Sequence, residues 1–132
     1  MCLILVAWKA HHDYPFIVAA NRDEFHARAT AVAGAWTDAP QVLAGRDLEA
    51  CGTWLGVTDA GRFAAVTNVR EPGVAPGSRS RGQLTRDFLI GAMEPAAYAA
   101  SVPAAEFSGF NLLVADAETL YYCSNRDGAP RA

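Results

Sequence analysis

Hydrophobic residues of the chain gather in short runs that predict paired β-strands. Residues 2–8 and 15–22 are two apolar runs rich in β-forming residues, and the polar stretch 9–14 separates them. Two such runs joined by a polar break predict a β-hairpin with a longer loop. The chain therefore opens with a predicted hairpin that has Cys2 at its free end.

Two more hairpins and one short strand are predicted further along the chain. Each hairpin consists of two runs of β-forming residues separated by a few turn-forming residues such as Asp and Gly. The first pairs residues 53–58 with 62–69 around the turn Asp59–Gly61, and the second pairs residues 110–115 with 119–123 around Asp116–Glu118. The short strand covers residues 41–45.

The segment between these hairpins changes character from loop to helix. Residues 70–79 hold two Pro and two Gly and predict a loop. Ser80 and Gln83 have the spacing of a capping box, which predicts a helix starting at Ser80. A second short helix is expected from Pro95 to Val102. Antiparallel strands with one or two helices predict an α+β fold, and we expect one domain over residues 1–132.

Composition and charge exclude several classes of function. The chain has 132 residues, of which 52% are hydrophobic and 19% charged, and its net charge is −3. Because basic residues form no stripe that would neutralise phosphates, we expect no nucleic-acid partner. The apolar start is too short for a membrane span and has no basic residue before it, unlike a secretory signal. We therefore expect no membrane span and a cytoplasmic location.

Three cysteines occur, at positions 2, 51 and 123. Their odd number and wide spacing match neither a disulfide framework nor a zinc site, so we expect free thiols. The three histidines, His11, His12 and His26, fall in predicted loops without a spaced ligand partner, so we expect no metal. No cofactor is expected either. Cys51 and Cys123 are expected to be structural. Cys2 has two readings of equal weight, as a small core residue or as a nucleophile.

Asn, Arg and acidic residues recur where strands end: Asn21–Glu24, Gly45–Asp47, Asn68–Glu71 and Ser124–Asp127. For Arg46–Asp47 and Arg126–Asp127 we favour the reading as turn residues and surface ion pairs, which contribute little individually. The first group is different because the opening hairpin places it beside Cys2. One register sets Cys2 opposite Asp23 with Asn21 on the same face, and a one-residue slip brings Arg22 and Glu24 there instead. The sequence leaves both registers open.

Either register gives Cys2 neighbours suited to nucleophilic chemistry. A thiol attacks as the thiolate, which a nearby Arg stabilises. If Met1 is removed, Cys2 also carries an α-amine, with a pKa of about 8, that acts as its own general base. Asp23 would orient this amine, and Asn68, chosen from its position at another strand end, would donate to the oxyanion.

Several ordered motifs carry a resemblance to a known family. Met1-Cys2 is followed by "AANRDEF", "GRD", "GTWLG", "TNVRE", "SRG" and "YYCSNR". This set, which spans nearly the whole chain, resembles the NRDE family. The resemblance implies an N-terminal-nucleophile hydrolase-like fold, an αββα sandwich similar to that of penicillin acylases and bile-salt hydrolases. It also implies that Cys2 is the nucleophile, with Arg22 and Asp23 beside it.

Members of this family continue for about as much again beyond the "SNR" strand. We therefore expect an incomplete sandwich, which is either truncated or completed as a homo-oligomer. The leading hypothesis is a cysteine amidohydrolase acting on a small amide or acylated metabolite through acyl transfer to Cys2. The alternative, also implied by the resemblance, is a non-catalytic carrier of haem or a lipid-like ligand.

These hypotheses assign roles to eight residues. Arginine is suited to binding a carboxylate or phosphate of a ligand, and asparagine offers both a donor and an acceptor. The candidate catalytic residues are Cys2, Arg22, Asp23 and Asn68, and the candidate substrate-binding residues are Asn21, Glu24, Arg70 and Asn125.

Overall fold

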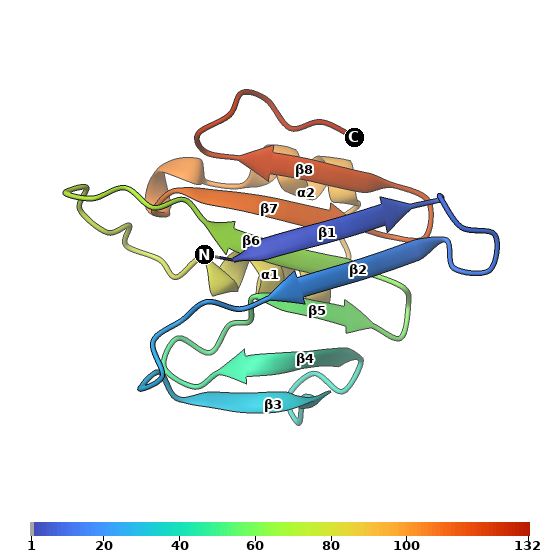
Figure 1. The fold of residues 1–132 in the computed structure, drawn as a ribbon, viewed down its shortest axis with the longest axis horizontal. Coiled ribbons are helices and arrows are strands. Elements are labelled where there is room, and N and C mark those ends of the chain that lie inside the picture. The colour runs from blue at the N-terminus through green and yellow to red at the C-terminus, as the bar shows by residue number, and fades with distance from the viewer. Residues whose placement is uncertain (1) are drawn as a thin grey trace.

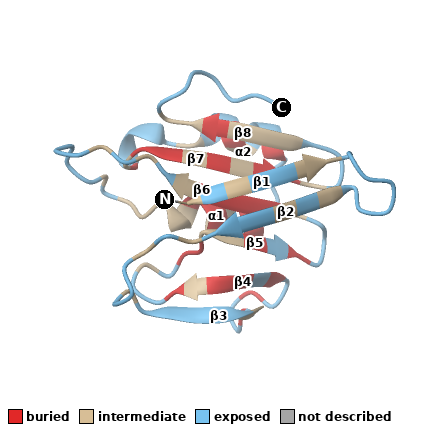
Figure 2. Ribbon diagram, in the orientation of Figure 1, coloured by how far each residue is buried: buried red, intermediate tan, exposed pale blue. Residues whose placement is uncertain are grey.

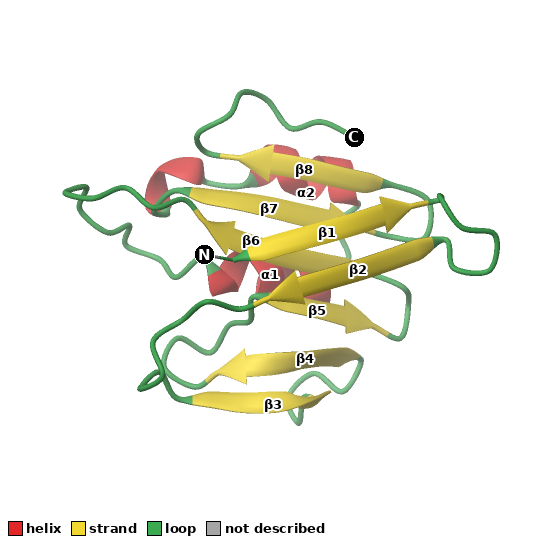
Figure 3. Cartoon of the chain, in the orientation of Figure 1, coloured by secondary structure: helices red, strands yellow, loops and turns green. Residues whose placement is uncertain are grey.

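The computed structural model describes residues 2–132, which form two antiparallel β-sheets and two α-helices (Figure 3). The predicted α+β class is confirmed. In chain order the elements are β1 (Leu3–Trp8), β2 (Phe16–Asn21), β3 (Thr30–Ala35), β4 (Val42–Asp47), β5 (Leu55–Thr58), β6 (Phe63–Asn68), α1 (Gly82–Ile90), α2 (Pro95–Ser101), a 3-10 turn (Ala104–Glu106), β7 (Phe110–Ala115) and β8 (Leu120–Ser124).

The larger sheet has six strands in the order β3-β4-β5-β6-β7-β8, and the smaller sheet is the hairpin β1-β2 (Figure 1). Neighbouring strands of the larger sheet are also consecutive in the chain, and every pair is antiparallel. The two helices are inserted between β6 and β7 and cover one face of this sheet. The hairpin lies across the opposite face.

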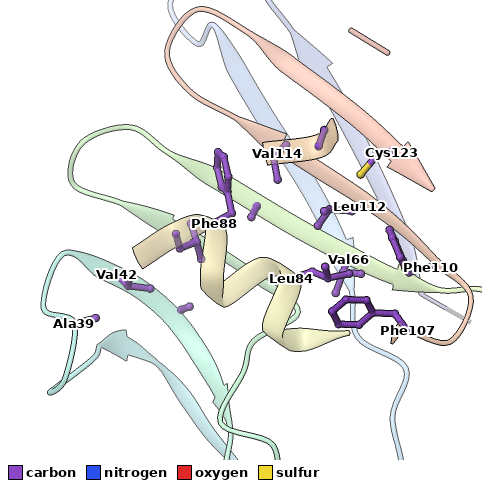
Figure 4. Close-up of a cluster of buried hydrophobic side chains, with 14 of the residues drawn as sticks. Ala39, Val42, Val66, Leu84, Phe88, Phe107, Phe110, Leu112, Val114 and Cys123 are labelled. Carbon is purple, nitrogen blue, oxygen red and sulfur yellow. The ribbon is translucent and has the colours of Figure 1, made fainter. Parts of the chain in front are cut away.

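The main hydrophobic core lies between the helices and the larger sheet (Figure 4). Leu84, Phe88 and Leu89 share one side of α1 because their spacing matches the helical repeat. Phe88 is fully buried, and its ring meets that of Tyr98 on α2 edge-on with centroids 5.1 Å apart. From the sheet, Leu112 contributes to the same core. This packing fixes α1 against the sheet.

A second, smaller cluster holds the β1–β2 hairpin to the sheet. Phe16 lies between Trp8 and Phe63 and meets both rings edge-on, with centroid distances of 5.2 and 4.8 Å. Ile4 and Val18 pack against the same cluster. Because side chains alternate along a strand, the intervening residues of the hairpin face solvent (Figure 2). Side-chain packing therefore provides most of the contact between the two sheets.

The hairpin covers only part of the larger sheet. Leu43 and Val57 are paired across β4 and β5 on the face that carries the hairpin, yet both side chains are exposed. Val32 on β3 is 91% exposed. Figure 1 shows β3 and β4 extending beyond the edge of β2. An apolar area of this sheet is thus left open.

Two details differ from the sequence prediction. β3 was missed, because its sequence TAVAGA consists mainly of small residues with weak strand preference. The predicted capping box is wrong: α1 begins after Arg81 without a side-chain cap, and the Gln83 amide oxygen accepts a hydrogen bond from Arg79 instead. The three predicted hairpins are all present.

Candidate active site

Cys2 lies at the free end of the hairpin, where the pairing of β1 and β2 sets its neighbours. Leu3 pairs with Asn21, so the same register places Cys2 opposite Arg22, the second of the two alternatives. The Asn21 amide oxygen accepts the backbone N–H of Leu3 at 2.9 Å. The Cys2 sulfur accepts the backbone N–H of Asp23 at 3.3 Å. This contact fixes the thiol against the first residues after β2.

The Cys2 side chain borders a cavity of about 120 Å³ to which several separate segments contribute. The hairpin and the residues after it provide Cys2, Arg22, Asp23, Glu24 and Arg28; the larger sheet and its loops provide Asp47, Thr53, Trp54, Val66 and Asn68; and the start of α1 provides Ser80, Arg81 and Gly82. All four candidate catalytic residues and Glu24 therefore meet at one cavity.

Arg70 lies beside this cavity rather than in it. With Cys2, Asp23 and Asn68 it lines an adjoining hollow of about 260 Å³. Its guanidinium donates to the Asp23 carboxylate at 2.7 Å, and its side chain is 76% exposed. The Asp23 carboxylate thus faces Arg70 while its backbone N–H faces the Cys2 sulfur.

Arg22 is held by two neighbours that limit its movement. Its guanidinium lies 4.4 Å from the centre of the Trp54 ring, a cation–π contact, and one of its nitrogens lies 3.9 Å from the Glu24 carboxylate. Trp54 therefore supports Arg22 from the side of the larger sheet.

A buried ion pair forms one wall of the cavity. Asp47 is 7% exposed, and Arg28 donates to it at 2.7 Å. Burial alone would raise the pKa of the Asp47 carboxyl, but the Arg28 hydrogen bond and the backbone N–H groups of Glu49 and Ala50 outweigh it and lower the pKa. Asp47 is therefore a carboxylate that holds Arg28 in place.

Of the two residues Arg46 and Asp47, for which turn positions and surface ion pairs were expected, Arg46 forms an ion pair near the surface and Asp47 is buried. Successive side chains of a strand point to opposite faces, so Arg46 pairs with Asp38 and stacks on Trp36 while Asp47 points toward the cavity. Arg126 and Asp127 both form surface ion pairs with other residues: Arg126 binds Glu71 at 2.6 Å, and Asp127 binds Arg131 at 2.8 Å.

A close approach of two glycines brings the start of α1 to the cavity. A Cβ atom added to Gly52 would lie 2.5 Å from the carbonyl carbon of Gly82. The same approach allows the Thr53 N–H to bond the Gly82 carbonyl at 3.1 Å. Arg81, next to this contact, donates to the Gly109 carbonyl at 3.0 Å. Burial lowers the pKa of its guanidinium.

Two candidate substrate-binding residues make local contacts instead. The Asn125 amide accepts the backbone N–H of Phe110 and donates to the carbonyls of Ala104 and Phe107, so it ties the loop before β7 to the end of β8. Asn125 and Asn21 are not among the residues lining the Cys2 cavity. The structure instead brings Arg28, Asp47 and Arg81 to that cavity. For Asp47, the sequence suggested a surface pair.

The described residues contain neither a cluster suited to a metal nor a long apolar helix. Between residues 2 and 132, no three His, Cys, Asp or Glu side chains gather in a group able to hold a metal ion. Within that range no helix is long and apolar enough to cross a bilayer.

Comparison with known proteins identifies the family of the chain. The model of the family Transport and Golgi organisation 2 matches residues 1–131. The chain belongs to this family. Transport and Golgi organisation 2 is the NRDE family, so the resemblance drawn from the motifs is confirmed.

Individual members of the Transport and Golgi organisation 2 family are about one-third identical to the chain. The mouse homologue is 36% identical over 90% of the chain, and the bovine homologue is 36% identical over 96% of it. The Drosophila melanogaster protein is 37% identical over 71%. The matched regions are 46% and 51% of the mouse and bovine proteins, so the chain spans about half the length of these relatives.

Proposed function

We propose that the Cys2 cavity is the active site of an N-terminal-nucleophile amidohydrolase. The observation that carries this proposal is the position of the Cys2 sulfur, which is held by the Asp23 N–H at the mouth of a polar cavity that Asn68 also lines. Met1 lies outside the described residues, and the mechanism requires its removal. Cys2 would then carry a free amine beside its own thiol.

Acyl transfer to Cys2 would be the first chemical step. The α-amine takes the thiol proton, and the sulfur attacks the carbonyl carbon of the amide. The carbonyl oxygen becomes an oxyanion that accepts a hydrogen bond from the Asn68 side chain. The C–N bond then breaks, the amine returns the proton to the leaving nitrogen, and a thioester remains on Cys2.

Water would complete the reaction by hydrolysing the thioester. The α-amine accepts a proton from the attacking water, the C–S bond breaks, and the acyl group leaves as a carboxylic acid with the thiol restored. Asp23 would orient the amine, since its backbone already contacts the sulfur and its carboxylate is fixed by Arg70. Arg22 and Glu24 would position the substrate at the cavity.

A panel of acyl p-nitroanilides tests this proposal. We expect a rapid release of p-nitroaniline that approaches one equivalent per chain, and a mass increase equal to the acyl group on the peptide that contains Cys2. Cys2→Ala should abolish both signals, and Cys51→Ala, at an exposed thiol outside the cavity, should leave them unchanged. Hydrolysis that persists in Cys2→Ala would contradict the mechanism.

A second candidate function is a carrier of haem or a lipid-like molecule. An apolar hollow of about 550 Å³ beside Trp54 favours it, because Val32, Leu43 and Val57 line this hollow. Its size suits a small apolar ligand. The names of the mouse and bovine relatives, which include the word transport, are compatible with such a role.

Titration with haem separates the two candidates. The carrier hypothesis expects equal binding by the native chain and Cys2→Ala, and a loss in Val57→Asp, which places a charge in the hollow. Binding that is unaffected by Val57→Asp would remove the hollow from consideration. A small-molecule substrate, a cytoplasmic location and self-association stay predictions from the sequence.

A further inference from the structure

The charged residues around the Cys2 cavity are paired with one exception. Arg28 binds Asp47 at 2.7 Å, and Arg22 lies 3.9 Å from Glu24. Arg81 lines the same cavity, but among residues 2–132 it forms no ion pair, and its guanidinium donates a hydrogen bond to the backbone carbonyl of Gly109. A guanidinium has five N–H donors in a planar fork, so most of its donors are left for another partner.

The environment of Arg81 makes the lack of a direct ion pair unfavourable for the free protein. Its side chain is partly buried, and burial is the largest influence on its pKa. The negative charges of Glu24 and Cys2 oppose the effect of burial and the positive charge of Arg28 adds to it, yet the pKa of the guanidinium remains below its ordinary value. Charged side chains removed from water are normally compensated by a partner of opposite sign. An anion brought by a ligand would supply that partner.

Arg81 is also placed between two cavities. It lines the Cys2 cavity and a second one of about 370 Å³ that lies against the loop after β6. Asn68 lines both cavities as well. A ligand that reacts at Cys2 and reaches past these two shared residues would enter the second cavity. The walls of the second cavity include Val69, Pro72 and Val74, which suit a partly apolar group.

We propose that the substrate of the Cys2 site carries an oxyanion, either a carboxylate or a phosphate, that binds the Arg81 guanidinium. The planar fork of arginine matches both groups through two parallel hydrogen bonds. This inference rests on the proposed function of Cys2 and adds the substrate class, which is an amide that also carries a carboxylate or phosphate group. Arg81 would act in binding, and Cys2 in the chemistry.

Two alkylating agents of similar size test the inference. In both iodoacetate and iodoacetamide the methylene carbon forms a bond to the sulfur as iodide leaves. Only iodoacetate carries a carboxylate. The rate ratio of iodoacetate to iodoacetamide is measured at Cys2 and divided by the same ratio at the exposed Cys51. We expect this normalised ratio to fall about tenfold in Arg81→Gln. A tenfold change corresponds to the loss of one charge-assisted hydrogen bond to the carboxylate.

A matched control and a second variant keep the experiment decisive. Arg86→Gln changes an arginine of α1 that lines none of the described cavities at Cys2 and should leave the ratio unchanged. If Arg81→Gln fails to fold, Arg81→Lys retains a donor for Gly109 and the positive charge but loses the fork, and should lower the ratio about threefold. An unchanged ratio in the Arg81 variant that folds overturns the inference.

A binding measurement that does not depend on thiol reactivity identifies the anion. Inorganic phosphate and acetate, at matched ionic strength, are compared for their effect on the melting temperature of the native chain and the Arg81 variant. A rise with phosphate alone indicates a phosphorylated ligand, a rise with acetate alone indicates a carboxylate, and in either case the rise must be absent in the variant. No rise in the native chain overturns the inference.

The outcomes for this inference and for the proposed function are separable. If Cys2 reacts rapidly with iodoacetamide but shows no dependence on Arg81, the nucleophile proposal stands and the anion site fails. If Cys2 is unreactive and the anion still raises the melting temperature through Arg81, the binding site stands without the chemistry.

Discussion

The position of Cys2 depends on how firmly the β1–β2 hairpin is held, and Phe16 is the residue to perturb. Its ring lies between Trp8 and Phe63 in the cluster that joins the two sheets. Phe16→Ala removes both aromatic contacts and leaves the main core between the helices and the sheet intact. The hairpin should open locally, and the rest of the fold should remain stable.

The expected cost follows from the burial of the ring. Full burial of a Phe side chain stabilises by about 1.5–3 kcal/mol, and each edge-on aromatic pair adds about 0.5–1.5 kcal/mol. Since Phe16 is partly exposed, we expect a loss of about 2–3 kcal/mol. That loss raises the population of the open hairpin about 30- to 150-fold. Ile17→Ala, which truncates a 42%-exposed neighbour, should cost less than about 1 kcal/mol.

Native-state hydrogen exchange measures this change strand by strand. Amides of β1 and β2 should exchange about 30- to 150-fold faster in Phe16→Ala, and those of β6 and β7 should change much less. Equal acceleration in all four strands would show that the hairpin is not an independent unit. Unchanged protection of β1 and β2 would refute the role of Phe16.

Three further predictions test other parts of the structure. Phe88→Ala, at a fully buried ring, should lower the free energy of unfolding by about 3–5 kcal/mol in urea denaturation. Asp47→Asn should lower the free energy of unfolding by about 1–3 kcal/mol at pH 7. Because the folded protein holds the pKa of Asp47 below its ordinary value of 3.8, this difference in stability should persist above pH 3.8. It should disappear as the pH falls through the pKa of the folded state. A pH-independent difference would contradict this. Gly52→Ala, whose Cβ would collide with the Gly82 carbonyl, should cost about 2 kcal/mol in thermal unfolding and slow alkylation of Cys2; a stable variant with normal reactivity would show that the α1 contact is dispensable.

Local sequence patterns were sufficient to predict the three hairpins and the position of α1, because each depends on short-range periodicity and turn residues. They did not predict β3. Its small side chains form a strand through pairing with β4, which is a contact between segments that no local pattern reports. The sequence also left two registers of the β1–β2 hairpin as alternatives. The structure distinguishes them, because Trp8 pairs with Phe16 at the closed end of this hairpin.

In the candidate site, too, local patterns identified some residues, whereas contacts between distant segments brought in the others. The motif after β2 led directly to Arg22, Asp23 and Glu24, since a hairpin brings the end of its second strand to the start of its first. Arg81 was not among the eight residues that the sequence assigned to the site. Its place at the cavity depends on the close contact of two distant glycines, which single-sequence reasoning does not reveal. Cys51 was expected to be structural, yet it is exposed in a left-handed turn conformation with a φ of 57°.

Mass spectrometry of the freshly purified chain, before and after a limiting dose of iodoacetamide, tests the central claim most directly. The three thiols serve as internal references, because Cys51 is exposed and burial raises the pKa of Cys123 to about 11. The account predicts that Met1 is absent and that the peptide beginning at Cys2 is alkylated before those containing Cys51 and Cys123. Retention of Met1, or a Cys2 that reacts no faster than Cys51, would contradict it.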